Sequence, residues 1–473
     1  MQYNKYTIIS FIVFLNGFYH LGAQSYIGFL TDNYAGINSV IVNPANIVDS
    51  RFQTDINLAG ISIFGVNDYY NMDIIKAISN ENYDFEKTSR FHPEMNNNGE
   101  ANVDIMGPSF MFNINDNNSI GFFTRTRSFI NINGINGQGI YAIGEDDENF
   151  RMDQINFNVL GQAWGEIGLS YAHVLFDERE NFIKGGLSVK YLKGGGSAYA
   201  EVRSMSIDYN ANGSLHSNGG TTGNVTTTGQ IVLGRFDDFE EDGYEYKLPI
   251  ASSGFGFDIG IVYEWRPNHK DYRHRKVWPD RLTYKEQNKY KLKIGLSITD
   301  IGYINYKNGI EDLFDITNTN VSEEAFENED NIYDALNNIY NLTNSSVGYR
   351  TVLPTALHVN VDWSFDNNFY LNFNTDLSLT AKNKLNKSNI TDLMTITPRY
   401  ESKWFSAYIP LSYVQYIGFQ AGAGFRLGPL YMGSSSLFTN LFSEKSKGAD
   451  FYAGLKIPVF HGKYDKGNNC NCN

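Results

Sequence analysis

The feature that most constrains this chain is an alternation of apolar and polar residues that returns many times. Between Phe255 and Trp265, every second residue is large and apolar, and mainly glycine and acidic residues lie between them. Successive side chains of a strand point to opposite faces, so this period of two indicates strands with one apolar and one polar face. Many such strands of about ten residues are typical of a transmembrane β-barrel.

We expect fourteen such strands, an even number, as single-chain bacterial barrels require. They cover residues 53–65, 104–115, 118–131, 163–176, 182–194, 253–266, 289–301, 355–366, 368–380, 393–402, 404–414, 417–427, 429–437 and 449–460. Two further stretches, 199–209 and 224–233, alternate without a strong apolar face. We interpret them as a hairpin above the membrane, with a barrel of sixteen strands as the alternative. The prediction is an all-β, antiparallel transmembrane barrel over residues 53–460.

The connections between these strands alternate in length. The connections expected outside the cell are long, apart from 415–416, and those on the other side are short, apart from 267–288. Long extracellular loops and short periplasmic turns are the known asymmetry of such barrels. Loop 302–354 is expected to hold an acidic helix over about 322–340 that folds over the extracellular mouth.

The two ends of the chain predict its location. Residues 1–23 read as a secretory signal peptide, with Lys5 before a short apolar stretch, and a single anchor helix is the alternative. No internal run of roughly eighteen apolar residues exists, so helices are not expected to cross a membrane. We predict the bacterial outer membrane, with periplasmic termini. Residues 461–473 are expected to form a disordered periplasmic tail, and one residue separates its Cys470 and Cys472, which disfavours a disulfide between them.

Charge and motif content exclude several functions. The formal net charge is −14, which argues against nucleic-acid binding. Histidine, cysteine and carboxylate residues do not occur at metal-ligand spacing, and neither a nucleophile elbow nor a phosphate loop is present. We therefore expect no enzymatic activity, no cofactor and no metal.

Alternation also predicts which side chains line the barrel interior. Backbone groups find no water in hydrocarbon, so the sheet must close, and its apolar residues must then face lipid. The expected lumen-lining set carries both signs of charge, with amides between them: Arg125, Arg127, Lys184, Lys190, Asp258, Glu264, Lys291, Lys293, His358, Asn360, Asp362, Asn372, Asn374, Asp376, Gln420, Arg426 and Lys456. This composition leaves two alternatives open, a wet channel and a salt-bridged network that fills the interior.

The segment before the first strand, residues 24–52, is expected to fold into the barrel mouth as a plug. It contains the motif Asn43, Pro44, Ala45, and proline disfavours a central strand while Asn-Pro marks a turn. A loose N-terminal lead is the alternative interpretation.

The long connection 267–288 is markedly basic, whereas a periplasmic turn needs only a few residues. We interpret it as a docking surface for an acidic periplasmic partner, with a solvated strand extension as the alternative. Its candidate docking residues are Lys270, Arg273, Arg275, Lys276 and Arg281.

Several short motifs together resemble a known family. They are the signal ending in Gly22-Ala23-Gln24, the Asn43-Pro44-Ala45 motif, Thr299 to Gly302 at a strand end, Leu353-Pro354 before a strand, Gly428 to Gly433, and Tyr452 to Leu455. With the fourteen strands, they resemble a Bacteroidota branch of the FadL/PorV-like outer-membrane β-barrels. The likeness to fatty-acid transporters implies a luminal hatch containing Asn43, Pro44 and Ala45. The likeness to PorV relatives implies a partner protein for surface secretion. The polar lumen and longer loops depart from the transporters.

Two functions follow from these observations. The main prediction is a scaffold or accessory subunit of a surface secretion or assembly complex, with membrane lipid and a periplasmic or surface protein as partners. The alternative is a plugged transport channel for a small polar, amphipathic or hydrophobic solute.

Overall fold

The structure is a computed structural model of the 473-residue chain. It describes residues 25–80, 82–144, 149–215, 221–236, 252–269, 287–322, 325, 332–366, 368–382 and 386–461. The expected signal peptide and the tail beyond residue 461, with both cysteines, lie outside the described residues.

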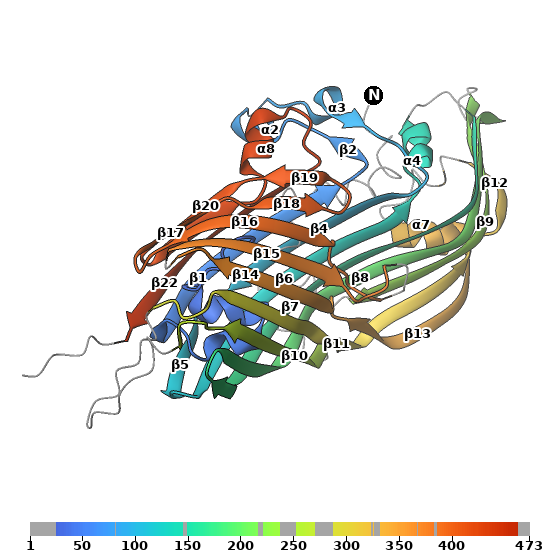
Figure 1. The fold of residues 1–473 in the computed structure, drawn as a ribbon. Helices are drawn as coiled ribbons and strands as arrows, with labels where there is room; N and C mark the ends of the chain where they lie inside the picture. The colour runs from blue at the N-terminus through green and yellow to red at the C-terminus, as the bar shows by residue number, and fades with distance from the viewer. Residues whose placement is uncertain are drawn as a thin grey trace, which may run out of the picture.

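A closed antiparallel barrel of fourteen strands forms the body of the molecule (Figure 1). The first strand, β1 (Phe52–Asn67), pairs with the last strand, β22 (Gly448–Phe460), so the sheet closes on itself. On its other side β1 pairs with β4 (Asn97–Met106) and β5 (Ser109–Asn115). Closure pairs the backbone groups that an open sheet would leave at its edges. The predicted fold class is confirmed.

Eight barrel strands follow as single elements: β6 (Asn118–Ile135), β7 (Phe150–Glu178), β8 (Asn181–Leu215), β10 (Ser252–Trp265), β11 (Leu292–Asp315), β14 (Ala356–Ser364), β15 (Phe369–Ser378) and β16 (Leu393–Glu401). The remaining ones are β17 (Phe405–Tyr408) with β18 (Leu411–Val414), β19 (Gly418–Ala421) with β20 (Ala423–Leu427), β21 (Leu430–Ser434) and β22. Three of the fourteen strands are each interrupted once, at Gly107-Pro108, Ile409-Pro410 and Gly422. A proline cannot donate to the ladder, and a glycine often marks a bulge, which explains these breaks.

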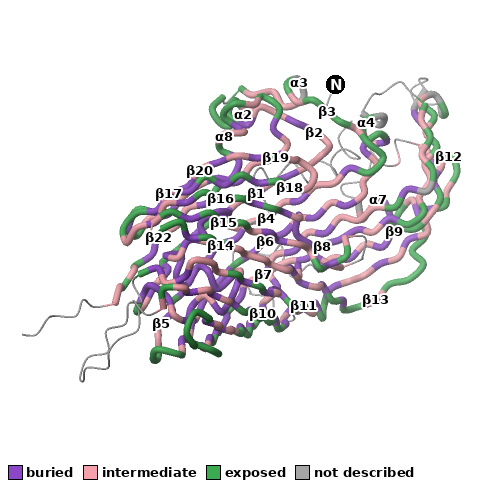
Figure 2. The backbone as a smooth tube through the Cα atoms, in the orientation of Figure 1, coloured by how far each residue is buried: buried purple, intermediate pink, exposed green. Residues whose placement is uncertain are grey.

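The outer face of the barrel is apolar. Along β10, Phe255, Phe257, Ile259 and Ile261 are exposed, while the residues between them are buried. Figure 2 shows the same alternation of buried and more exposed positions along the other strands. Exposed aliphatic and aromatic side chains recur on most barrel strands, far beyond the apolar patches that water-soluble monomers carry. This face is therefore the surface that meets lipid.

A sheet extension rises from one end of the barrel. There β8 continues into β9 (Thr221–Phe236), and β9 pairs with both β8 and β11 beyond the point where β10 begins. β12 (Asn318–Ser322) and β13 (Asn341–Val352) extend the same sheet. The stretches 199–209 and 224–233 thus form the expected hairpin, and they add no strand to the barrel.

Short elements cover the same end (Figure 1): β2 (Tyr70–Asn71), α2 (Ile74–Ser79), α3 (Phe85–Thr88), β3 (Arg90–Phe91), α4 (Gly137–Gly144), α7 (Ile332–Ile339) and α8 (Leu437–Phe442). The prediction of one helix over 322–340 is wrong at its start, because Ser322 is a strand residue that pairs with Asn224. The described helix α7 packs through Leu336 against Phe314. Within the described parts of the chain, no helix is long and apolar enough to cross a membrane.

The lipid-facing assignment can be tested at Ile259, near the middle of β10. An arginine placed in the middle of the bilayer on an outward face costs about 2–4 kcal/mol of stability. We expect Ile259→Arg to lower the free energy of unfolding, measured with urea in lipid vesicles, by this amount. Ile78→Arg is the control, because Ile78 is exposed on α2 beyond the barrel. Equal effects of both substitutions would contradict the assignment.

Candidate functional site

Residues 25–51, which we call the luminal segment, lie inside the barrel. Two short 3-10 helices, η1 (Gly36–Ile41) and η2 (Pro44–Ile47), shape it. The Asn43 side chain caps η2 by accepting a hydrogen bond from the Ala45 N–H at 3.0 Å, and Pro44 fits the first helical position because no N–H is needed there. The sequence thus forms a compact turn where a strand is forbidden.

An apolar core joins the luminal segment to the barrel wall. Its fully buried members include Tyr26, Phe29, Ile37, Val40 and Ile47, which pack with inward side chains such as Met106, Phe123 and Tyr452. Phe29 stacks on Tyr431 of β21 with ring centroids 4.0 Å apart. Burial of this many large side chains gives the segment a defined position inside the barrel.

Glycines on the inner wall make room for the Asn-Pro-Ala motif. A Cβ atom at Gly186 of β8 would lie 2.4 Å from the Ala45 backbone nitrogen, and one at Gly260 of β10 would lie 2.1 Å from Asn43 Oδ1. The Asn43 amide also donates to the carbonyl of Ile261 at 3.3 Å. The motif therefore rests directly on the backbone of β8 and β10.

Polar side chains of the wall hold the carbonyl groups of the luminal segment. Lys456 of β22 donates to the carbonyls of Tyr34 at 2.6 Å and Ala35 at 3.0 Å, and it contacts Asp55 at 3.1 Å. Ser297 donates to the Val42 carbonyl and Lys184 to the Val48 carbonyl. Backbone groups of irregular turns need such partners when they are buried.

A buried ion-pair network crosses the middle of the lumen. Arg127 contacts Asp300 at 2.6 Å and Glu166 at 3.4 Å, while Arg125 binds Asp104 through two nitrogens. The same network continues through Lys190, which contacts Asp300 and Asp258. Six strands contribute these groups. Removing one partner of a buried ion pair is strongly destabilising, and every charge of this network has an oppositely charged neighbour.

A second charged cluster lies where the luminal segment meets β10. Arg266 contacts Asp49 at 2.7 Å and Glu264 at 2.5 Å, and Lys289 contacts Asp49 at 2.8 Å. Burial alone would raise the pKa of Asp49, but Lys289 and Arg266 hold that pKa well below its usual range. This cluster therefore ties the end of the luminal segment to the wall through a carboxylate that stays charged.

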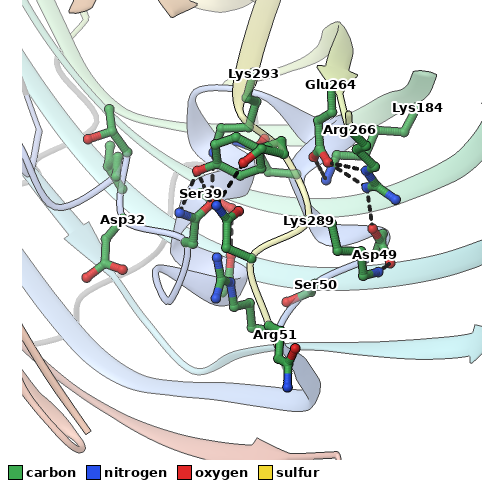
Figure 3. A pocket seen from close by; sticks show the side chains of 18 residues that line it. Asp32, Ser39, Asp49, Ser50, Arg51, Lys184, Glu264, Arg266, Lys289 and Lys293 are labelled. Atoms are coloured by element: carbon green, nitrogen blue, oxygen red, sulfur yellow. Dashed lines mark hydrogen bonds and ion pairs between the residues drawn. The ribbon is translucent and has the colours of Figure 1, made fainter. Parts of the chain in front are cut away.

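Two small cavities adjoin the luminal segment, with volumes of about 60 and 30 Å³. Figure 3 shows the larger one, into which charged side chains of the segment and of β8, β10 and β11 converge. Leu30, Thr31, Asn46 and Lys293 line both. Ligand pockets usually measure roughly 300–1,000 Å³, so the luminal segment leaves space only for small guests.

The other expected lumen residues form a polar ladder across β14 and β15. Both ring nitrogens of His358 are hydrogen-bonded, Nδ1 to Asp376 at 2.6 Å and Nε2 to Thr299 at 2.8 Å. Asn372 binds both Asn360 and Asp362. Asn374, which donates to Asp376, lines the smaller cavity.

The remaining expected site residues are placed in different surroundings. Arg426 is buried against Asp32 and Ser406, and Gln420 is buried on β19 opposite Ser412 of β18. Lys291 differs from the rest, because it lies just before β11 and donates to the Phe365 carbonyl at an exposed position. The candidate docking residues Lys270, Arg273, Arg275, Lys276 and Arg281 lie outside the described residues.

A second inward-folded segment closes the opposite end of the barrel. In this mouth loop, which spans residues 379–392 with 383–385 not described, Ser388 and Asn389 are buried. Asn389 exchanges two hydrogen bonds with Asn131, and Ser388 donates to Gln162 at 2.8 Å. Sequence reasoning placed 381–392 in an extracellular loop and missed its inward turn. The one available signal was the absence of charge from residues 388–391.

An aromatic cluster lies under the mouth loop. It contains Phe129, Trp164, Tyr306 and Tyr349 from four strands, together with Ile390 of the loop itself. Phe129 and Trp164 stack at 5.5 Å, and Arg127 lies over both rings. Apolar side chains thus line the lumen on both sides of the ion-pair network, toward the mouth loop and toward the luminal segment.

These features define the class of protein: an integral membrane β-barrel that is closed from within by its own chain. The chain belongs to DUF5723, a family of unknown function, whose family model matches residues 44–435. Comparison with curated proteins finds no match.

Among solved structures, the chain is similar to several outer-membrane barrels. The Ralstonia pickettii toluene transporter TbuX has 9% identity and a TM-score of 0.37, with 90% of this chain and 94% of that chain covered. A Pseudomonas aeruginosa FadL homologue has 11% identity and a TM-score of 0.43, with coverage of 94% and 100%. The Pseudomonas putida toluene transporter TodX has 9% identity and a TM-score of 0.36, with coverage of 92% and 94%.

FadL-type barrels are thus among the similar structures, while the PorV-like and Bacteroidota parts of the resemblance remain predictions.

The close contact between Gly186 of the inner wall and the Asn-Pro-Ala motif predicts how the luminal segment can be displaced. We expect Gly186→Ala to push Pro44 and Ala45 away from β8, because the added Cβ would meet their backbone at 2.4 Å. Amides of residues 36–51 should then exchange with deuterium at least about tenfold faster, since local opening sets their protection. Gly165→Ala is the control, because a Cβ there meets no atom within 4 Å. Unchanged exchange in Gly186→Ala would contradict the close contact.

The ion pairs of Asp49 with Arg266 and Lys289 predict that mild acid leaves the luminal segment attached to the wall. A carboxyl whose folded pKa is lowered stabilises the fold above its unfolded pKa of about 3.9, and this stabilisation is lost only as pH falls through the folded pKa. We expect the protection of residues 44–51, corrected for intrinsic exchange, to be the same at pH 7 and pH 5. Asp49→Asn should lower it at both values. A loss of protection between pH 7 and pH 5 in the unmodified chain would contradict this assignment.

Proposed function

We propose that this chain is a gated transport channel of the bacterial outer membrane, with the luminal segment as its plug. The observation that supports the proposal most strongly is that a separate stretch of chain fills the lumen. Barrels of about eight strands are filled by their own wall side chains, whereas wider barrels leave space for a channel or a plug. A scaffold that only presents a surface patch would not need a lumen wide enough to require a plug. The plugged lumen therefore favours a channel.

The way in which the plug is held also supports gating. Besides the apolar core, its contacts are hydrogen bonds, ion pairs and packing against glycines, as at Lys456, Arg266 and Gly186. All of these contacts are noncovalent, and water or a polar solute can replace the hydrogen bonds and ion pairs among them. The plug can therefore leave the wall without breaking a strand pair.

Passage requires two closures to open in series. The plug closes one end of the lumen and the mouth loop closes the other, with the aromatic cluster between them. A solute that enters past the mouth loop meets aromatic side chains first and charged groups later. This order favours a small amphipathic or hydrophobic solute over a purely ionic one.

The scaffold role remains a prediction. It rests on the basic segment 267–288, of which residues 270–286 lie outside the described part of the chain. Its test is a comparison of co-purifying proteins from the unmodified chain and from a variant in which residues 270–286 are replaced by a short uncharged linker. Loss of a specific partner would support it, and the same set of partners would count against it.

Deletion of the plug tests the channel directly. We expect a chain lacking residues 25–51 to show more frequent single-channel openings in a planar bilayer than the unmodified chain, in which the plug and the mouth loop must open together. Because the mouth loop forms a second closure, a chain that also has residues 380–391 replaced by a glycine–serine linker should conduct more. Silence of both variants, inserted as folded barrels, would overturn the channel proposal.

A reversible lock tests whether plug movement opens the channel. The Cβ of a residue at position 260 would lie 2.7 Å from Asn43 Cγ. The Cβ atoms of cysteines at 43 and 260 would therefore fall within roughly 4.2 Å of each other, inside the range for a disulfide. We expect Asn43→Cys with Gly260→Cys, with Cys470 and Cys472 changed to serine, to conduct only after reduction. Each single-cysteine variant is a control, and its conductance should be the same before and after reduction. Equal conductance before and after reduction would show that the plug stays in place during opening.

A further inference from the structure

The larger cavity carries more positive than negative side chains. Among the described residues, five cationic side chains line it: Arg51, Lys184, Arg266, Lys289 and Lys293. Three anionic ones do: Asp32, Asp49 and Glu264. The described lining therefore has a surplus of two positive charges, and Figure 3 shows these groups around one space.

The carboxylates of the cavity are already engaged. Asp49 and Glu264 both bind Arg266, and Asp32 accepts from the Tyr34 N–H at 2.7 Å and faces Arg426 at 3.4 Å. Each of these three carboxylates thus already has a cationic partner.

Two cations of the lining are close to aromatic and neutral groups. Lys293 lies 3.9 Å from Asp362, donates to the Asn33 side chain at 3.0 Å and lies over the Tyr290 ring. The buried Arg51 donates to the Tyr370 hydroxyl at 3.4 Å and lies over the Tyr34 ring. An anion placed between these two side chains would find donors on both sides.

The size of the cavity and the uncharged polar side chains in its lining also suit a small anion. A water-sized sphere occupies roughly 10–15 Å³ of such volume, so about 60 Å³ holds around four waters or one small oxyanion. Ser39, Ser50, Asn46 and Asn288 add hydroxyl and amide groups to the lining. Charge-assisted bonds from guanidinium and ammonium groups to carboxylate or phosphate are among the strong hydrogen bonds in proteins.

We propose that this cavity is a binding site for a small oxyanion, a carboxylate or a phosphate, which competes with Asp49 for Arg266 and Lys289. Binding would exchange an internal carboxylate for an external one, and it would release the end of the luminal segment from β10. The second half rests on the proposed channel function, because it assigns the anion a role in freeing the plug. By linkage, an anion that binds the released state better shifts the population toward it.

The environment of Lys289 agrees with this proposal. Burial lowers its pKa even though Asp49 lies beside it and acts in the opposite direction. A second anion at this position would offset the cost of burying the ammonium group.

The binding test uses the full chain in detergent and titrates it with sodium phosphate or sodium acetate, followed by calorimetry, at constant ionic strength in sodium chloride. We expect one saturable site that chloride does not fill. Arg51→Gln and Lys289→Gln should each weaken the site at least about tenfold. Lys445→Gln is the control, because Lys445 is exposed beyond the barrel wall. The comparison of phosphate with acetate identifies which oxyanion the site prefers.

Asp49→Asn should change the affinity for the anion in the opposite direction to Arg51→Gln and Lys289→Gln. Removing the competing carboxylate should tighten anion binding several-fold, whereas a purely structural role of Asp49 would weaken it. Asn suits this position, because Asp49 has φ +53 and asparagine is among the residues that adopt this conformation most readily. Weaker binding by Asp49→Asn would overturn the competition, and equal binding by Arg51→Gln, Lys289→Gln and the unmodified chain would overturn the site.

Failure of this inference is distinct from failure of the channel proposal. If phosphate and acetate do not bind while the chain lacking residues 25–51 conducts, the oxyanion site is wrong and the channel stands. If an oxyanion binds with the expected variant pattern but the deletion variants never conduct, the site stands and the channel is wrong.

Discussion

A β-barrel in lipid must pair every backbone group within its own wall, and this requirement sets the size of its interior. Fourteen strands satisfy it here by joining β1 to β22, and the resulting lumen is wider than the wall side chains alone would fill. The chain solves this problem with two of its own segments, one from each end of the lumen. The glycines of β8 and β10, the lysines that donate to carbonyls of the luminal segment and the Arg266–Asp49 pair hold this separate piece of backbone inside the wall.

Buried ion pairs hold much of the interior. Charges removed from water cost several kcal/mol each unless good geometry and further hydrogen bonds compensate for it. In the middle of the lumen, Arg127, Lys190 and Asp300 meet from three strands, and their partners come from further strands. Such a network favours one arrangement of the wall. Under the proposed channel function it would also offer alternative partners when the luminal segment moves. Polar filling therefore suits a lumen that has both a closed and an open state.

The features that could be predicted from the sequence are those that follow from the two-residue alternation of apolar and polar side chains. Alternation located all fourteen strands, because each strand has one face in lipid. It did not reach the partners of the inward charges, since pairing depends on which strands face each other across the lumen. Asp300 shows a second limit. It follows the inward Thr299 and by alternation would point outward, but its positive φ of 58° and the register shift opposite it, in β10, turn the side chain inward. The mouth loop was missed because its polar residues suit water as well as they suit Asn131 and Gln162.

The contacts of Lys456 constrain the order in which this molecule can assemble. Lys456 lies on the last strand, Asp55 lies on the first strand, and the carbonyls of Tyr34 and Ala35 belong to the luminal segment. The strand pair that completes the cylinder is therefore also the one that captures the luminal segment. A chain built this way encloses its own interior segment during closure, and the segment need not be threaded into a finished pore.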